Sequence, residues 1–473
     1  MISDSKKISS LKDSDLNYIK LVSHACIFIK LGDIHLITDP WLFGDVFNNA
    51  WSLQLKKKSD KLLNSKEINS ITHIWLSHEH PDHFHIPSLK FLSSKIEKPS
   101  RVQIIMKKDP RTIKTIKPLL NKFGFEKVLL LKHLEKFLLN KELELSIYHH
   151  RHIDSALLLK YKSKPLILNL NDAELNNYDC NLIKKKFGNF EILINQFSLA
   201  GYDGIINNEN LKKQKYEILK KMTNQHKILK AKVTIPFASF MWFSRSDNKH
   251  LNKWHNSLSD VYEHFQKQGM NCFCIEPPSN KISLDNILRG SKKPDLNLKN
   301  IFHEKVDESI NVDQYELAKI ISQRLNNLKT FSNSLLFKLV EKNLFIYVKD
   351  KNWLFNISNN KNKLDCNYVK ENIKNIDNKM LINLQPIHFA FVNSFGIQTL
   401  GVSGRYKFEG FKKVPKIWRL IRILSSLENN ETPLRFRTLL KLEIYKLIID
   451  RKETLPKQII QQIKRYFFNT SSN

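Results

Sequence analysis

The feature that most constrains this chain is a histidine-rich segment, His-Glu-His-Pro-Asp-His, at residues 78–83. It follows a short apolar stretch that predicts a buried strand and precedes a stretch with helical spacing. In an extended loop, His78 and His80 can turn towards one point, and the adjacent Asp82 and His83 can reach a neighbouring point. Imidazole and carboxylate groups are the ligands that zinc, iron and manganese prefer. The segment therefore predicts a metal site at a strand end.

The rest of the chain divides into two parts. Strands and helices alternate up to about residue 288, and the polar stretch at residues 289–300 predicts a domain boundary. We therefore predict an α/β catalytic domain at residues 1–290 and a second, mainly helical domain of unknown role at residues 300–473. In the second domain we expect helices at residues 312–328, 333–341, 414–428, 432–451 and 455–467. We also expect a strand pair inside this domain, at residues 344–350 and 352–358.

The histidine-rich segment resembles the His-x-His-x-Asp-His motif of the metallo-β-lactamase superfamily. Two earlier segments resemble the start of the proteins in one branch of this superfamily, which holds ascorbate-6-phosphate lactonase and N-acyl-phosphatidylethanolamine phospholipase D. They are Ser-His-Ala-Cys at residues 23–26 and Leu-Ile-Thr-Asp-Pro-Trp at residues 36–41. Within that branch, the chain most resembles the catalytic part of the CMP-N-acetylneuraminate hydroxylases, also through residues 235–240 and 276–278. The resemblance covers residues 20–290 and implies an αββα sandwich, with metal ligands on loops at one edge.

The resemblance also implies roles for individual residues. Three histidines would hold a first metal, while carboxylates and His83 would hold a second metal or orient the attacking water. Catalytic roles fall to Asp82 and to His24, which in this branch lies beside the metal pocket. We expect one or two zinc ions, with Fe²⁺ or Mn²⁺ as the alternative. The metal ligands implied are His78, His80, Asp82, His83, His152 and Asp172.

Several assignments stay open at this point. The third histidine ligand is His149, His150 or His152, and we favour His152, which shares a strand face with His150 because alternate residues face the same way. Asp39 closes a strand before a Pro-Trp pair, so it either caps a turn or belongs to the site. Arg245 and His250 bind an anionic group near the pocket or lie in a solvated loop.

The sequence predicts a metal-dependent hydrolase. A bound zinc ion lowers the pKa of its water to about 7, so a metal-bound hydroxide forms at neutral pH. The expected substrate is an anionic phosphoester, lactone or amide, for example a nucleotide sugar or a lipid or glycan precursor. The alternative is an iron oxygenase of a nucleotide or surface sugar, which would take electrons from a separate ferredoxin or Rieske protein.

The sequence departs from the resembled families in two ways. The first departure favours the hydrolase, and the second limits the number of metal ions. The hydroxylases begin with a Rieske domain, but this sequence has no paired Cys-x-His and Cys-x-x-His segments for such a cluster. Many hydrolases of the superfamily carry a late histidine as a ligand of the second metal. Here residues 235–237 read Ile-Pro-Phe, so that ligand is missing from the expected place.

The charge of the chain bears on its partners. Lysine and arginine number 77 against 46 aspartate and glutamate residues, which gives a net charge of +31. Such a field attracts anionic molecules, but the sequence has no aromatic-interleaved basic patch or reader motif, so we do not expect nucleic acid as a partner. The segment at residues 434–449 is basic on one face and apolar on the other. It either packs on its own domain or makes a peripheral membrane contact.

The chain is expected to be cytoplasmic. Its start has no apolar signal segment, and no run of 18 apolar residues occurs in it. Its five cysteines are scattered and odd in number, which is not typical of a disulfide scaffold.

Overall fold

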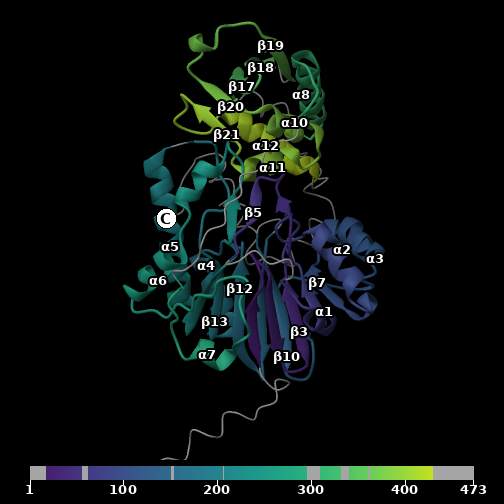
Figure 1. Ribbon diagram of the computed structural model, residues 1–473, viewed down its shortest axis with the longest axis vertical. Helices are drawn as coiled ribbons and strands as arrows, with labels where there is room; N and C mark the ends of the chain where they lie inside the picture. Colours follow the sequence, from purple (N-terminus) through teal and green to yellow (C-terminus); the bar gives the residue numbers. More distant parts are fainter. Residues whose placement is uncertain are drawn as a thin grey trace, which may run out of the picture.

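The computed structural model describes residues 17–55, 62–150, 154–205, 207–295, 309–331, 340–360 and 363–429. Within this part of the chain, two β-sheets stack face to face and helices cover their outer faces (Figure 1). We call these two sheets and their helices the sandwich. The described residues from 309 to 429, which we call the C-terminal region, lie at one end of the sandwich and make the molecule elongated (Figure 1).

The first sheet has seven strands in the order β16-β1-β2-β3-β6-β7-β8. Its strands β1, β2 and β3 are antiparallel, whereas β3, β6, β7 and β8 run parallel to one another. The β2–β3 hairpin turns at Gly32, whose φ of +59° is a conformation that glycine adopts without steric cost. The strands are β1 (Tyr18–Leu21), β2 (Ile27–Leu31), β3 (Ile34–Thr38), β6 (His73–Trp75), β7 (Gln103–Lys107), β8 (Lys127–Leu131) and β16 (Ile282–Ser283).

The second sheet has six strands in the order β14-β13-β12-β11-β10-β9. The strands from β9 to β12 pair antiparallel, and β12, β13 and β14 run parallel. They are β9 (Phe137–Leu138), β10 (Leu143–His149), β11 (Ser155–Tyr161), β12 (Lys164–Asn171), β13 (Ile192–Gln196) and β14 (Val233–Phe237).

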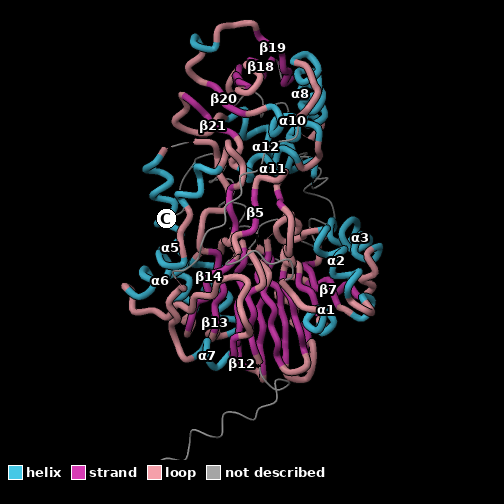
Figure 2. Tube along the Cα trace, in the orientation of Figure 1, coloured by secondary structure: helices cyan, strands magenta, loops and turns pink. Residues whose placement is uncertain are grey.

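Alternating side chains give each sheet a buried inner face and a helix-covered outer face. In β2, for example, Ile27, Ile29 and Leu31 enter the core between the two sheets, whereas Phe28 packs under the helices outside. Figure 2 shows the helices outside the strands of the sandwich. Helices α1 (Ser65–Ser70), α2 (Ile86–Lys95) and α3 (Lys117–Lys122) cover the first sheet, and α4 (Asn177–Phe187) and α5 (Asn208–Leu229) cover the second.

A small third sheet lies between the sandwich and the C-terminal region (Figure 1). It consists of β4 (Asp45–Val46), β5 (Trp51–Leu53) and β15 (Met241–Phe243). The turn between β4 and β5, residues 47–50, is called the junction loop below. Phe47, Asn48 and Asn49 have φ values of +53°, +58° and +56°. Such left-handed conformations are tolerated by asparagine but are strained for phenylalanine, so surrounding contacts must hold this loop.

The C-terminal region combines helices with a five-stranded sheet in the order β19-β18-β17-β20-β21. Two expected helices are confirmed as α8 and α12, and the expected strand pair is confirmed as the antiparallel β17–β18. The helices expected at 432–451 and 455–467, and most of the one at 333–341, lie outside the described residues. The elements are α8 (Gln314–Lys329), β17 (Asn343–Val348), β18 (Trp353–Asn360), β19 (Lys363–Val369), β20 (Lys379–Ile382), α10 (Leu384–Val392), α11 (Gly396–Ser403), β21 (Tyr406–Glu409) and α12 (Lys416–Asn429).

This architecture is an αββα sandwich with an additional C-terminal region that contains helices, as the sequence predicted. Two sheets enclose one core, and helices close both outer faces. Among the helices that the structure describes, none has both the length and the apolar character needed to cross a membrane.

Candidate metal centre

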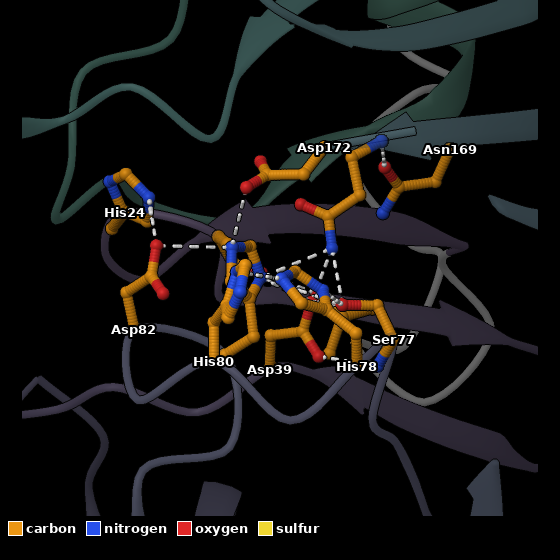
Figure 3. A network of polar contacts seen from close by, with 12 residues as sticks. His24, Asp39, Ser77, His78, His80, Asp82, Asn169 and Asp172 are labelled. Carbon is orange, nitrogen blue, oxygen red and sulfur yellow. Dashed lines mark hydrogen bonds and ion pairs between the residues drawn. The ribbon is translucent and has the colours of Figure 1, made fainter. Parts of the chain in front are cut away.

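The expected site residues lie on loops that follow three strands. β3 and β6 are parallel neighbours, with Thr38 opposite Trp75, so the loops after them begin side by side. Asp39 follows β3, the histidine-rich segment at 78–83 follows β6, and Asp172 follows β12 of the facing sheet. Figure 3 shows the side chains from these loops converging on one region, where the two sheets meet.

A fully buried carboxylate, that of Asp39, forms the floor of this region. It accepts hydrogen bonds from the backbone N–H of Ser77 at 2.8 Å and from the Ser77 hydroxyl at 2.7 Å. Its Oδ2 atom lies 2.9 Å from Nδ1 of His83 and also accepts a hydrogen bond from the Asn171 amide. A buried carboxylate is stable only when donors surround it in this way. Asp39 therefore fixes the position and the ring orientation of His83.

His24, Asp82 and His83 form the first group that could hold a metal ion. Nε2 of His24 lies 3.5 Å from Oδ2 of Asp82, and Nε2 of His83 lies 3.2 Å from the same oxygen. One ligand atom from each of the three residues lies within 4.8 Å of the others, and all three side chains are buried. His24 comes from the loop between β1 and β2, far in sequence from the other two.

His78, His83 and Asp172 form a second group, which shares His83 with the first. Oδ2 of Asp172 lies 3.2 Å from Nε2 of His83, and the ring centroids of His78 and His83 are 4.2 Å apart. Nδ1 of His80 lies 2.9 Å from Nε2 of His78, so His80 stands beside this group without belonging to it. The two groups are therefore contiguous, and six of the expected residues are adjacent in space.

The donor atoms of these groups fit a divalent cation. Asp82 Oδ1, Asp172 Oδ1 and His24 Nδ1 are buried and accept or donate no hydrogen bond among the described residues. A buried carboxylate oxygen without a partner costs roughly 1–3 kcal/mol or more, so an ion that binds it would stabilise the fold. Imidazole and carboxylate donors suit zinc, iron and manganese alike.

Neighbouring charges control the protonation of His83 and Asp82. Burial by itself would lower the pKa of His83, but Asp82, Asp172 and Asp39 together raise it well above its usual value. Burial would raise the pKa of Asp82, but His83 and His24 hold it well below its usual range. The carboxylates around His83 thus favour a positive charge at this point, which a divalent cation would supply in place of the Nε2 proton of His83.

His78 and the nearby His85 differ in role. Burial, together with His83 and His80, holds the pKa of His78 well below its usual value, so His78 is a neutral imidazole, the form that binds metals. His85 is not close to the two groups. Its Nδ1 accepts a hydrogen bond from the backbone N–H of Ser88, which makes it the N-cap of α2.

The assignment of His152 as the third histidine ligand stays a prediction, because His152 lies outside the described residues. His149 Nε2 lies 3.0 Å from the carbonyl oxygen of Leu131, and His150 Nδ1 lies 3.7 Å from Oδ2 of Asp179. Neither histidine joins the two groups formed by described residues. Asp179 also accepts a 2.7 Å hydrogen bond from the hydroxyl of Tyr148.

The C-terminal region contacts the metal-binding loops at two points. At the first, Oε1 of Glu79 accepts a 2.8 Å hydrogen bond from Nη1 of Arg111. The guanidinium of Arg111 in turn lies 4.6 Å from the ring centroid of Phe395, at the start of α11. Glu79 thus pairs with Arg111, belongs to neither of the two metal-binding groups and anchors the loop that follows β6.

The second contact runs through the junction loop. The side-chain amides of Asn48 and Gln385 exchange two hydrogen bonds, of 2.8 and 2.9 Å. The adjacent Phe47 ring packs edge-on against His80, with centroids 6.1 Å apart. α10 therefore holds the strained loop whose phenylalanine contacts a histidine of the centre.

The supporting roles of Ser77 and Asn171 cannot be read from the sequence alone, and Asp39 stays open there between two roles. Their partners are remote in sequence: Asn171 and Asp39, for example, are separated by 132 residues. One usable signal was present, because Asn171 directly precedes Asp172 at the end of a strand. A polar residue in that place faces the same edge of the sheet as the ligands.

Comparison with known proteins gives one local likeness in sequence. No family model matches the chain. A stretch of 77 residues, 16% of the chain, is 40% identical to the cytidine monophosphate-N-acetylneuraminic acid hydroxylase of Asterias rubens and covers 11% of that protein. The likeness to the hydroxylases expected from the sequence is thus confirmed over this stretch. The likeness to the lactonase and phospholipase branch stays a prediction.

Two solved structures resemble the sandwich at low identity. CmlA, a diiron β-hydroxylase from Streptomyces venezuelae, is 12% identical with a TM-score of 0.39, over 57% of this chain and 54% of that one. A protein described as a possible metal-dependent hydrolase from Veillonella parvula is 14% identical with a TM-score of 0.42, over 57% of this chain and 100% of that one.

Proposed function

We propose that the chain is a metal-dependent hydrolase of an anionic substrate. The observation that carries this proposal is the pair of groups that share His83, in which Asp82 Oδ1 and Asp172 Oδ1 are buried and find no hydrogen-bond partner within the described part of the chain. A divalent cation bound there would supply a Lewis acid and lower the pKa of a bound water to about 7. Zinc is the ion we expect, with Fe²⁺ or Mn²⁺ as the alternative.

The residues of the chain would divide the remaining work. His78, His83, Asp82 and Asp172 would hold the cation, with His80 and His152 as further ligands. His24 would serve as the proton acceptor of the reaction, with its ring oriented by Asp82, whose Oδ2 lies 3.5 Å from Nε2 of His24. Asp39 would keep His83 in one orientation through its hydrogen bond to Nδ1.

The charge and the division of the chain support an anionic substrate bound between two parts. A net charge of +31 attracts phosphoesters and carboxylates, including nucleotide sugars and lipid or glycan precursors. We assign the chemistry to residues 1–290, and we assign residues 300–473 to a second domain that holds the junction loop and the Glu79 loop in place.

One observation favours a second function. The local likeness is to a hydroxylase, so the same centre with iron could serve an oxygenase of a nucleotide or surface sugar. That reaction would need electrons from a ferredoxin or Rieske partner protein. The hydrolase needs no electron donor, and we therefore place it first.

The two functions are separated by an assay in two arms. The first arm gives zinc- or manganese-loaded protein a panel of nitrophenyl phosphodiesters, lactones and CMP-sugars, without oxygen or reductant. The second arm adds ferrous iron, oxygen and a ferredoxin reducing system. We expect turnover in the first arm, abolished by Asp82→Asn and retained by Asp33→Asn, which removes an exposed charge. Turnover only in the second arm, with oxygen consumed in step with product, would replace the hydrolase by the oxygenase.

A further inference from the structure

A pocket of about 280 Å³ opens where the C-terminal region packs against the sandwich. Asp247 and His250, which follow β15, line one side of it. The ends of β17 and β21 line the other side with Lys349, Arg405, Tyr406 and Lys407. None of these residues belongs to the two metal-binding groups, so the pocket is a separate feature.

The pocket has a rigid, buried guanidinium at its base. The side chain of Arg405 is 1% exposed, and its Nε and Nη2 atoms contact the carboxylate of Asp247 at 3.0 to 3.1 Å. Nη1 of Arg405 donates a 2.7 Å hydrogen bond to Oε1 of Gln385. The one carboxylate of the lining is therefore balanced by Arg405, and it is not available to neutralise other cations.

Two lysines then leave the pocket with an excess of positive charge. Lys349 follows β17 and Lys407 lies in β21, so they approach the pocket from strands on either side of β20. Neither ammonium group forms an ion pair with a residue that the structure describes. Two unpaired ammonium groups beside one neutralised carboxylate make a local field that favours an anion.

His250 lines the same pocket. Burial and the neighbouring Lys253 lower its pKa most, Asp247 acts in the opposite direction, and Lys407 and Lys349 lower it further. The neutral His250 that results can donate one hydrogen bond to an anionic ligand.

We propose that this pocket binds the phosphate group of a small phosphate ester. Lysine ammonium groups bind phosphate as point charges, and the ion pair of Asp247 with Arg405 keeps the carboxylate of the lining from competing for them. Ligand pockets measure roughly 300–1,000 Å³, so a pocket of this size suits a phosphorylated sugar or nucleoside rather than a large ligand. Leu381, which lies opposite Lys407 in the β20–β21 pair, supplies an apolar side chain for the ester part.

Binding at this place would also join the two parts of the molecule. The ligand would contact side chains of the sandwich and of the C-terminal region at once, so it would stabilise their packing. The base of the pocket reaches the junction loop, because Arg405 holds Gln385 and Gln385 holds Asn48. This inference goes beyond the hydrolase proposal and does not depend on it.

The test is calorimetric titration of the full chain after metal removal, so that phosphate cannot bind at the metal centre. The probes are inorganic phosphate, glucose 6-phosphate and adenosine monophosphate, each at low salt, and the preferred probe identifies the ester part. The double variant Lys349→Gln/Lys407→Gln should bind the preferred probe at least tenfold more weakly. The conservative variant Lys349→Arg/Lys407→Arg should keep most of the affinity, because the charges remain.

The matched control is Lys412→Gln/Lys413→Gln, which removes two exposed charges of the same region outside the pocket. It should bind like the unaltered chain, and the preferred probe should raise the unfolding temperature of both. An equal loss of affinity in the two glutamine variants would mean that diffuse charge binds phosphate, and it would overturn the proposal. Absence of binding of all three probes at millimolar concentration would overturn it as well.

Discussion

At the scale of single residues, Asp39 links the stability of the fold to the geometry of the site. Its carboxylate is fully buried and accepts hydrogen bonds from two groups of Ser77 and from Asn171, while it contacts Nδ1 of His83. These partners come from the loop after β6 and from the last residue of β12. Removing the carboxylate would leave several buried donors unsatisfied at once.

We therefore predict that Asp39→Ala lowers the free energy of unfolding by about 3 kcal/mol, the range found when one partner of a buried charged network is removed. The control is Asp33→Ala, which removes an exposed aspartate from the β2–β3 hairpin and should change stability by less than about 0.5 kcal/mol. Urea unfolding of the metal-free protein measures both. Equal effects of the two substitutions would show that Asp39 does not organise the buried network.

At the scale of elements, the junction loop is strained and is held by another part of the chain. Three consecutive residues of the loop have positive φ values, and the amide pair between Asn48 and Gln385 joins it to α10. Ser244 and Arg245 add hydrogen bonds to the carbonyl of Asn49. The loop conformation thus depends on long-range contacts rather than on its own sequence.

A double-mutant cycle tests this dependence. Asn48→Ala and Gln385→Ala should each destabilise the protein, and their effects should fall short of additivity by about 1 kcal/mol, because the second substitution removes a contact that is already lost. Urea unfolding of the two single variants and the double variant supplies the cycle. Strictly additive effects would mean that the amide pair contributes no coupling between the loop and α10.

Local patterns explain which elements the sequence predicted. The histidine-rich segment and the β2–β3 hairpin carry their signals within a few residues, and α8 and α12 have clear helical periodicity. The strands β20 and β21 have four residues each and contain lysines, so no window of sequence distinguishes them from loops. The partners of Asp39 and the Asn48–Gln385 pair arise only after distant strands have packed together.

At the scale of the whole molecule, a buried ion pair joins the sandwich to the C-terminal region. The side chains of Asp247 and Arg405 are 4% and 1% exposed, and the nitrogen and oxygen atoms approach to 3.0 Å. Asn248 adds a 2.7 Å hydrogen bond to the carbonyl oxygen of Ser403 in α11. These contacts, together with the two that reach the metal-binding loops, make the C-terminal region part of the site's support.

We predict that Arg405→Ala lowers the free energy of unfolding by about 3 kcal/mol, because the carboxylate of Asp247 would stay buried without its counter-charge. The control, Lys413→Ala, removes an exposed cation of the same region and should be nearly neutral. Thermal and urea unfolding measure the two variants side by side. If Arg405→Ala were as stable as Lys413→Ala, the junction would not be held by this ion pair.

The central claim is that the two groups around His83 bind a divalent cation, and zinc titration of metal-free protein tests it most directly. We compare the unaltered chain with Asp82→Asn and Asp172→Asn, and with Asp33→Asn as the control for an equal change of charge. We predict zinc affinities at least tenfold weaker for the first two variants and unchanged for the third. Circular dichroism would verify that all four proteins are folded. Tight, stoichiometric zinc binding that neither Asp82→Asn nor Asp172→Asn weakens would contradict the account.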